Sequence, residues 1–478
     1  MMTFSNKQYL RRSALLSCTR NLLLAAFSII ALSACIGSDS DDPEPFTPPE
    51  PPNINAQIRI IHASPDAPAV DVLANGNSVG GLADLDYQTA TGLAFIRTGS
   101  FEFTVEAQLP GGASASVITL PATLENDVQY NVLAIGEVAN IAGLVVANPE
   151  TAVGDGNIRA QVVHGAPNAP TVDIYVTAPD ADIAVSQPLA TLAFGEFTGQ
   201  VEVPAGSYRI RVAAAGTTTV VFDSGTIEIA AGVDLFITAT ENVLGGEAPI
   251  NLTVADGLGS GVIVDVNSQA QVRAIHGIAD APAVDVFADI EGDNDLLLFD
   301  AAPFKGVTDY ISVPAGDYLL DVKADADNGI VAIDDAAVSL MANVRYTALA
   351  NNSLANADLD LVVDDGRPLA TAAQVRVFHA SQATGPVDIY VTSDGEIDGV
   401  DPAFAGVAYS MDALAETGYV QLAAGDYVLT VTPTGTKTEA IETGVLTLEA
   451  AKIYTAFAVD GDMIGDAPQL ILADDFVE

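Results

Sequence analysis

Beyond the first fifty residues, apolar and polar positions alternate in short stretches bounded by turn residues. In four stretches a glycine is followed by aromatic, apolar and valine residues at every second position, and these are 99–105, 206–212, 316–322 and 425–431. A period of two is typical of a strand with one buried face. No long apolar stripe with a period of 3.6 follows residue 35. We therefore expect many short strands, and helices that are few and short.

A histidine-led segment recurs four times along the chain. Its first copy is His62-Ala-Ser-Pro-Asp-Ala-Pro-Ala-Val-Asp71-Val. The other copies align with it without gaps, and they pair His164 with Asp173, His276 with Asp285, and His379 with Asp388. The four histidines are all that the chain contains. A repeat of this kind predicts tandem copies of one structural unit.

Each predicted unit holds several strands within roughly 100 residues, which is typical of a two-sheet sandwich. We therefore predict an all-β protein with four tandem immunoglobulin-like β-sandwich domains. The predicted domain ranges are 56–152, 157–256, 270–365 and 373–478. Units of this size can fold alone, so we expect them to behave as independent beads on a string.

The first 55 residues predict export and anchoring rather than a folded domain. A basic segment precedes the apolar run 21–34, and Leu32-Ser33-Ala34-Cys35 resembles the bacterial lipobox. That resemblance implies a lipoprotein signal peptide over 1–34 and lipidation of Cys35. An ordinary signal peptide is the alternative. Residues 35–55 are rich in Pro and Asp and predict an extended tether. Ile36 rather than Asp follows the cysteine, and in bacterial lipoproteins of this kind that resemblance implies the outer membrane of the cell envelope, with the periplasmic or external face left open.

The net charge of the chain limits the classes of partner that it can bind. Asp and Glu number 63 against 17 Lys and Arg, which gives a formal net charge of −46. Such a surface repels nucleic acid, and we expect membrane contact through the lipid anchor alone. The two cysteines, Cys18 and Cys35, offer the domains neither a disulfide framework nor thiolate zinc sites. The expected partner is an unidentified protein or glycan of the envelope or the extracellular space.

The string that begins at His62 resembles the hallmark of a bacterial extracellular domain family of unknown function, found in lipoproteins and wall-anchored proteins. The resemblance covers residues 56–478 with drift, and the fourth copy departs most, at Gln382-Ala383-Thr384-Gly385. It implies an extracytoplasmic address and a β-rich fold. It implies no activity.

The repeated histidine–aspartate pairs are the only candidates for catalytic chemistry in the sequence. Such a pair can orient a general base or ligate a metal. The chain has no Gly-x-Ser-x-Gly and no His-Glu-x-x-His motif, and each copy has a single histidine. We therefore expect a structural role for the pairs, no catalytic residues, and a non-enzymatic spacer, adhesin or interaction scaffold. The alternative is an extracytoplasmic enzyme or sensor array that uses these pairs.

Acidic residues also gather after the second strand of copies three and four. Alternate carboxylates in a loop can converge on Ca²⁺, which takes six to eight oxygens. The candidate ligands are Asp289, Glu291, Asp293 and Asp295 in copy three, with Asp394, Glu396 and Asp398 in copy four. We predict weak calcium binding there and no other cofactor. Solvated acidic loops without an ion are the alternative.

Overall fold

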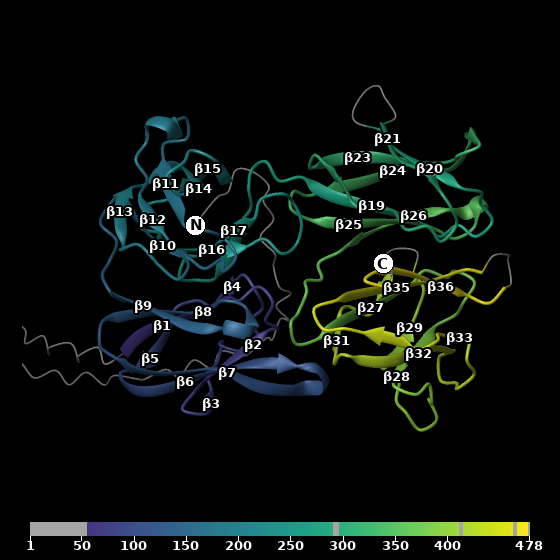
Figure 1. The fold of residues 1–478 in the computed structure, drawn as a ribbon, viewed down its shortest axis with the longest axis horizontal. Helices are drawn as coiled ribbons and strands as arrows, with labels where there is room; N and C mark the ends of the chain where they lie inside the picture. The colour runs from purple at the N-terminus through teal and green to yellow at the C-terminus, as the bar shows by residue number, and fades with distance from the viewer. Residues whose placement is uncertain (1–54, 290–295, 411–413, 462–465, 477–478) are drawn as a thin grey trace, which may run out of the picture.

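The computed structural model describes residues 55–289, 296–410, 414–461 and 466–476, and within them it is built almost entirely of β-strands (Figure 1). The all-β sandwich prediction is confirmed. Four short 3₁₀ helices, η1 to η4, are the only helical segments in these ranges. The predicted signal peptide, Cys35 and most of the tether lie outside the described residues. None of the helical segments within the described ranges has the length and hydropathy to cross a membrane.

The strands form eight sheets that fall into four successive pairs, and we call these pairs units 1 to 4. Unit 1 contains β1 (Asn55–Ala63), β2 (Val70–Ala74), β3 (Asn77–Ser78), β4 (Thr89–Ala90), β5 (Ala94–Arg97), β6 (Gly99–Leu109), η1 (Pro110–Gly112), β7 (Ala113–Leu124), β8 (Val128–Ile135), η2 (Val138–Asn140) and β9 (Ala142–Pro149). Unit 2 contains β10 (Asn157–His164), β11 (Val172–Thr177), η3 (Ile183–Val185), β12 (Ala190–Leu192), β13 (Val201–Pro204), β14 (Gly206–Ala214), β15 (Val220–Ile229), β16 (Asp234–Glu241), β17 (Ile250–Ala255) and β18 (Ser260–Ile263). The last of these strands lies beyond residue 256, where the sequence places the end of this domain.

The second half of the chain repeats this arrangement. Unit 3 contains β19 (Ala270–His276), β20 (Val284–Asp289), β21 (Leu296–Ala302), β22 (Ile311–Val313), β23 (Gly316–Ala324), β24 (Asp327–Leu340), β25 (Arg345–Asn351), η4 (Leu354–Asn356) and β26 (Asp358–Val363). Unit 4 contains β27 (Ala373–His379), β28 (Val387–Thr392), β29 (Phe404–Val407), β30 (Ala415–Glu416), β31 (Val420–Leu422), β32 (Gly425–Pro433), β33 (Ile441–Glu442), β34 (Leu446–Leu448), β35 (Ile453–Val459) and β36 (Gln469–Asp474).

The four units share one sheet topology, to which unit 2 adds β18 at the edge of its first sheet. The first sheet of unit 1 runs β4-β1-β8-β9 and its second sheet runs β3-β2-β6-β7. The first strand of each unit pairs in parallel with a strand 72 to 79 residues later in the chain, and these pairs are β1–β8, β10–β16, β19–β25 and β27–β35. The remaining pairings between named strands are antiparallel. The histidine of each repeat therefore lies at the end of a central strand of the first sheet, as its last residue in units 2 to 4 and one residue before the last in unit 1.

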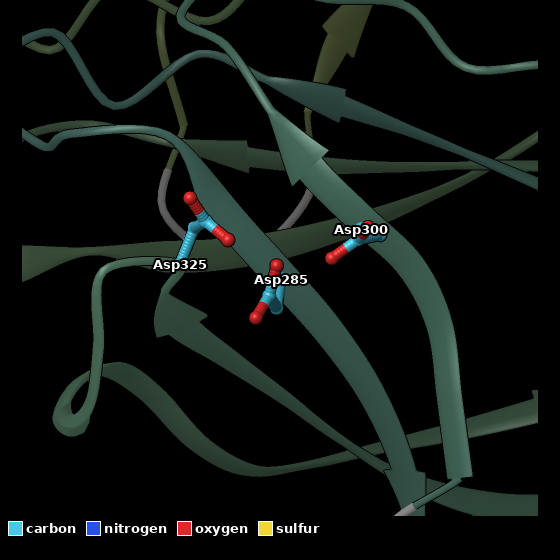
Figure 2. A group of neighbouring side chains, drawn as sticks. All are labelled: Asp285, Asp300 and Asp325. Carbon is cyan, nitrogen blue, oxygen red and sulfur yellow. The ribbon is translucent and has the colours of Figure 1, made fainter.

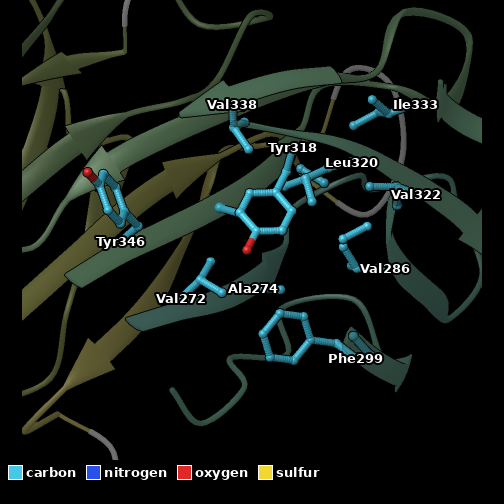
Figure 3. Close-up of a cluster of buried hydrophobic side chains, with 14 of the residues drawn as sticks. Val272, Ala274, Val286, Phe299, Tyr318, Leu320, Val322, Ile333, Val338 and Tyr346 are labelled. Atoms are coloured by element: carbon cyan, nitrogen blue, oxygen red, sulfur yellow. The ribbon is translucent and has the colours of Figure 1, made fainter. Parts of the chain in front are cut away.

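The core of each unit lies between its two sheets, as Figure 3 shows for unit 3. Along β23 the alternate residues Tyr318, Leu320 and Val322 are buried, as the period of two predicts. The Tyr318 hydroxyl donates to the carbonyl oxygen of Pro314 at 2.6 Å. The Tyr346 hydroxyl accepts the backbone N–H of Met341 at 3.1 Å. Both tyrosines thus contribute a buried ring while their hydroxyls stay hydrogen-bonded.

The units are not independent beads, and that expectation is wrong. The outer faces of the first sheets of units 1 and 2 pack together, and so do those of units 3 and 4 (Figure 1). The first interface is the buried apolar cluster Ile61, Ala63, Ala90, Leu133, Ile135, Val146, Val163, Phe236 and Ala255. The second is Ile275, Leu349, Val362, Phe378, Ala380, Phe457, Val459, Ile471 and Ala473. The first strands therefore bury both faces, one in their own sandwich and one against the neighbouring unit.

Buried arginines stand beside these interfaces. The Arg59 guanidinium lies 4.8 Å from the ring centroid of Phe236 in unit 2 and donates to the Ala255 carbonyl oxygen at 3.2 Å. Burial lowers the pKa of Arg59 to about 10, which leaves it charged at neutral pH. Arg273 of unit 3 lies 2.7 Å from the Asp474 carboxylate of unit 4. Each interface thus combines apolar contact with a desolvated charge that has partners across it.

The two pairs of units also contact each other. Arg367, in the segment that joins units 3 and 4, donates to the Pro65 carbonyl oxygen at 3.0 Å and to the Asp86 carboxylate at 2.7 Å. Its guanidinium stands over the Tyr87 ring, 5.4 Å from the centroid. The described units therefore form one block in which a connecting segment from the second pair rests on unit 1 (Figure 1).

Candidate functional site

The histidine of each repeat clamps the loop that follows it. Its Nε2 lies 2.9 to 3.1 Å from the carbonyl oxygen six residues later, which belongs to Pro68, Pro170, Pro282 and Gly385 in the four units. In units 1, 3 and 4, Nδ1 accepts a backbone N–H two residues later at 3.2 to 3.3 Å. A ring that accepts at Nδ1 carries its proton on Nε2 and donates from there. The imidazole therefore replaces backbone pairing that the loop cannot make for itself.

The four histidines are at most 1% exposed, and each ring meets a later aromatic ring at 6.0 to 6.4 Å between centroids. These aromatic partners are Tyr87, Phe194, Phe304 and Tyr409. Burial lowers the pKa of His62 to about 4, and the nearby Arg367 charge also lowers it. Burial likewise lowers the pKa of His276. Such sites hold the neutral imidazole that the hydrogen bonds require.

The repeated aspartates have partners of their own. Asp71 accepts the N–H of Asp84 at 2.8 Å, Asp173 that of Gly216 at 2.7 Å, and Asp285 that of Ala301 at 2.9 Å. Asp388 accepts the N–H groups of Gly406 and Gly435, each at 2.8 Å. The Gly435 bond, more than the Gly406 bond, holds the pKa of Asp388 below its usual range. Among the described residues no hydrogen bond joins a histidine to the aspartate nine positions later.

The predicted calcium ligands are only partly placed. Asp289 ends β20, and Glu291, Asp293 and Asp295 lie outside the described residues. In unit 4, Asp394, Glu396 and Asp398 are exposed, and Asp394 accepts the N–H of Glu396 at 3.1 Å.

The ammonium group of Lys437 already donates hydrogen bonds to carbonyl oxygens of the unit 4 acidic loop. Lys437 Nζ donates to the carbonyl oxygens of Ile397 and Val400, at 2.7 Å each. Its Nζ also lies 4.2 Å from the ring centroid of Tyr390. This lysine lies about 40 residues after the loop, in the turn that follows β32, where sequence spacing gives no sign of it.

The described residues contain two clusters of three aspartates each, and both clusters lie in unit 3. The carboxylates of Asp285, Asp300 and Asp325 lie within 4.8 Å of one another, and Figure 2 shows them on three neighbouring segments of the second sheet. The second group is Asp321, Asp334 and Asp335, where Lys323 Nζ lies 2.9 Å from Asp321. With one oxygen from each, three carboxylates supply about half of the six to eight oxygens that Ca²⁺ takes. The sequence singles out Asp285 but not Asp325, which follows the end of β23 and reaches the group only through strand pairing.

The model of a protein family described as a domain of unknown function, DUF4397, matches residues 56–175 and 270–390. Each match begins at the first strand of unit 1 or unit 3 and ends within the second strand of the following unit. No curated protein matches the chain.

Solved structures similar to this chain include three bacterial proteins. The TIE protein of Bacillus anthracis is 12% identical with a TM-score of 0.16, and the match covers 84% of this chain and 68% of that one. A family CBM26 module of Eubacterium rectale Amy13K, solved with maltoheptaose, is 10% identical with a TM-score of 0.15, over 43% and 96% of the two chains. A leucine-rich repeat protein of Bacteroides thetaiotaomicron is 15% identical with a TM-score of 0.12, over 41% and 26%. With TM-scores of this size, none of the three informs on the ligands of this chain.

Proposed function

This chain belongs to the DUF4397 family of domains of unknown function, and from that premise we propose that it is a lipid-anchored protein of the cell envelope that acts as a non-enzymatic interaction scaffold. Its four units are four copies of one domain, held off the membrane by the segment before Asn55. The segment that follows Cys35 is rich in proline and acidic residues, which supports an extended tether.

One observation carries the non-enzymatic part of this proposal. The imidazoles, which offer the one catalytic interpretation of the sequence, are at most 1% exposed and bond to the backbone of their own loops. A general base needs a ring nitrogen within reach of a substrate proton. Nε2 of all four histidines faces a carbonyl oxygen instead. The repeated aspartates accept hydrogen bonds from backbone N–H groups, so both members of each pair stabilise the fold of their own unit.

The scaffold part rests on the shape and charge of the block. Paired sheets and a connecting segment bonded to unit 1 give a broad surface rather than four separate modules. With a formal charge of −46 for the whole chain, that surface favours a partner with a basic or neutral contact area.

Affinity capture with the full chain tests the scaffold. Envelope and extracellular fractions are passed over the immobilised protein, with polyglutamate-coated beads as a control for negative charge alone. We expect a discrete macromolecule that the full chain retains and the polyglutamate beads do not. A small-molecule turnover activity that His→Asn substitution of all four histidines abolishes in a still folded protein, with no macromolecule captured, contradicts the proposal.

The anchor has its own test. Cys35→Ser should abolish acyl labelling and leave an uncleaved or mislocalised precursor, with Cys18→Ser as the matched control. Protease added to intact cells then distinguishes the external face from the periplasmic face of the outer membrane. Acyl labelling and membrane retention of Cys35→Ser equal to wild type would refute the anchor.

A further inference from the structure

The end of the sandwich next to the histidine loop is closed in the same way in units 1 and 3. In unit 1 the turn η2 crosses this end and Ile141 packs against the core. In unit 3 the turn η4 does so through Leu354. An aspartate four residues after the histidine accepts a backbone N–H of each turn, Asp66 at 2.8 Å and Asp280 at 2.6 Å.

In unit 2 the corresponding loop, residues 242–249, turns toward unit 3 instead. Asn242 Nδ2 donates to Asn343 Oδ1 of unit 3 at 2.7 Å. Gly246 lies so close to the same residue that a Cβ there would stand 2.8 Å from its Oδ1. This loop is described throughout, and no residue between Asn242 and Pro249 belongs to the core cluster of unit 2. This end of the unit 2 sandwich is therefore left open.

A pocket of about 250 Å³ occupies that open end. Most of its lining is apolar and includes Ala169, Val172, Ala214, Val221 and Ile250, from the histidine loop and from strands of both sheets. The volume lies just below that of pockets for drug-sized molecules, so the space suits a ligand of roughly ten heavy atoms.

The lining of this pocket includes one carboxylate, that of Glu241. Glu241 ends β16 on the core-facing side, two residues after Ala239, and lines the pocket. Its Oε1 accepts the N–H of Asn168 at 2.7 Å, and Asn168 Nδ2 donates to the Glu137 carboxylate of unit 1 at 2.8 Å. The pocket therefore lies beside two acidic groups that share one amide residue.

The lining of the pocket contains no lysine or arginine. A fixed carboxylate at an apolar wall attracts a positive group and rejects a negative one, because the low dielectric of the wall strengthens both effects. The negative charge of the whole chain acts in the same direction.

We propose that the open end of unit 2 binds a small organic cation, whose ammonium group meets Glu241 and whose apolar body fills the space beneath the histidine loop. The site goes beyond the scaffold function and does not depend on it.

Phenylethylammonium is a suitable probe, with 2-phenylethanol and 3-phenylpropanoate as neutral and anionic analogues of similar size. The full chain is titrated with each probe, and binding is measured by calorimetry or ligand-observed NMR. Phenylethylammonium should bind with a Kd of about 1 mM, as expected for a ligand of this size. We expect at least tenfold weaker binding of the alcohol and none of the carboxylate. Glu241→Gln should weaken the ammonium at least tenfold and leave the alcohol unchanged, whereas Glu228→Gln on β15 of the same unit should change neither.

Two substitutions locate the binding. Ala169→Leu and Ala214→Leu fill the pocket from the histidine loop and from the end of β14, and each should abolish binding of all three probes, with the exposed Ala178→Leu of unit 2 as control. Thermal melting identifies any variant that fails to fold, and the other variant then decides. Equal affinity for the three probes, no binding at 10-fold the expected Kd of the ammonium (roughly 10 mM), or unchanged binding in a folded pocket-filling variant would each overturn the proposal.

Discussion

Phe457 is the residue whose loss should most clearly separate units 3 and 4. It lies on the outer face of β35, is fully buried, and stacks on Phe378 at 4.8 Å between ring centroids. Both rings belong to unit 4 and pack against Ile275, Leu349 and Val362 of unit 3. Phe457→Ala therefore removes contact between units rather than contact inside either sandwich.

The magnitude follows from the buried area. An aromatic side chain buries at least ~150 Å², and ~25 cal/mol per Å² gives a loss of about 4 kcal/mol. This agrees with the range of about 3–5 kcal/mol for buried Phe→Ala substitutions. For a cooperative block of roughly 200 residues, such a loss lowers Tm by about 10 °C.

Differential scanning calorimetry measures both the size and the form of the change. In wild type we expect units 3 and 4 to melt together, and in Phe457→Ala we expect two resolved transitions at lower temperature. Phe299→Ala, in the core of unit 3, should destabilise to a similar degree without weakening the interface directly. Phe95→Ala, at a side chain that is 70% exposed in unit 1, should change stability by at most about 0.5 kcal/mol. The reasoning is refuted if Phe457→Ala melts in a single transition within 2 °C of wild type, because such a shift corresponds to a loss of only about 0.5 kcal/mol.

Three further predictions concern buried charge and calcium. The pKa of His62 is about 4 in the folded chain and about 6.5 when unfolded, so the unfolded chain binds more protons between these values. Stability should fall by about 3 kcal/mol as pH drops from 6.5 to 4, which urea unfolding measures, and a stability that does not change over this window would contradict the burial argument. Asp474→Asn should lower the free energy of unfolding by about 3 kcal/mol, because it leaves the buried Arg273 without its partner at 2.7 Å. Asp475→Asn breaks the more exposed pair with Lys452 and should lower it by about 1 kcal/mol or less. Equal losses for the two substitutions would remove the case for a buried pair. Calcium binding by the acidic loops of units 3 and 4 stays a prediction: millimolar CaCl₂ should raise Tm beyond ionic-strength-matched NaCl, and identical melting curves would leave these loops as solvated acids.

The sequence predicted what depends on local pattern. The alternation in β23 places Tyr318, Leu320 and Val322 inward because successive side chains of a strand point to opposite faces. The sequence also predicts a structural role for the histidine, since no other catalytic group accompanies it. Its acceptor, the carbonyl oxygen six residues later, depends on the path of the proline loop, which a pattern of residue types does not specify.

The pairing of units could not be predicted from a search for one buried face. The first strands carry the signal in another form: β27 is buried at every residue, and β1 runs Ile58-Arg59-Ile60-Ile61 without alternation. A continuous apolar run is typical of a strand that is covered on both sides. The arginine within it looks like an exposed position, although Arg59 is 1% exposed and meets Phe236 of the next unit. Contacts such as Arg367 with Asp86 join residues about 280 positions apart, and no periodicity encodes them.

The parallel pairing inside each unit has a consequence for how far the protein reaches. In unit 1 the start of β1 pairs with the start of β8, whose other neighbour, β9, ends at the same place: Gln57 and Asn148 flank Gln129. The chain thus enters and leaves the unit on one side, and units 3 and 4 share this geometry. A chain that enters and leaves a unit on one side folds back on itself there, so further units of this geometry thicken the block and do not lengthen a stalk. For the lipid-anchored protein that we propose, the distance between the membrane and the units would then depend on the Pro- and Asp-rich tether after Cys35, and not on the number of units.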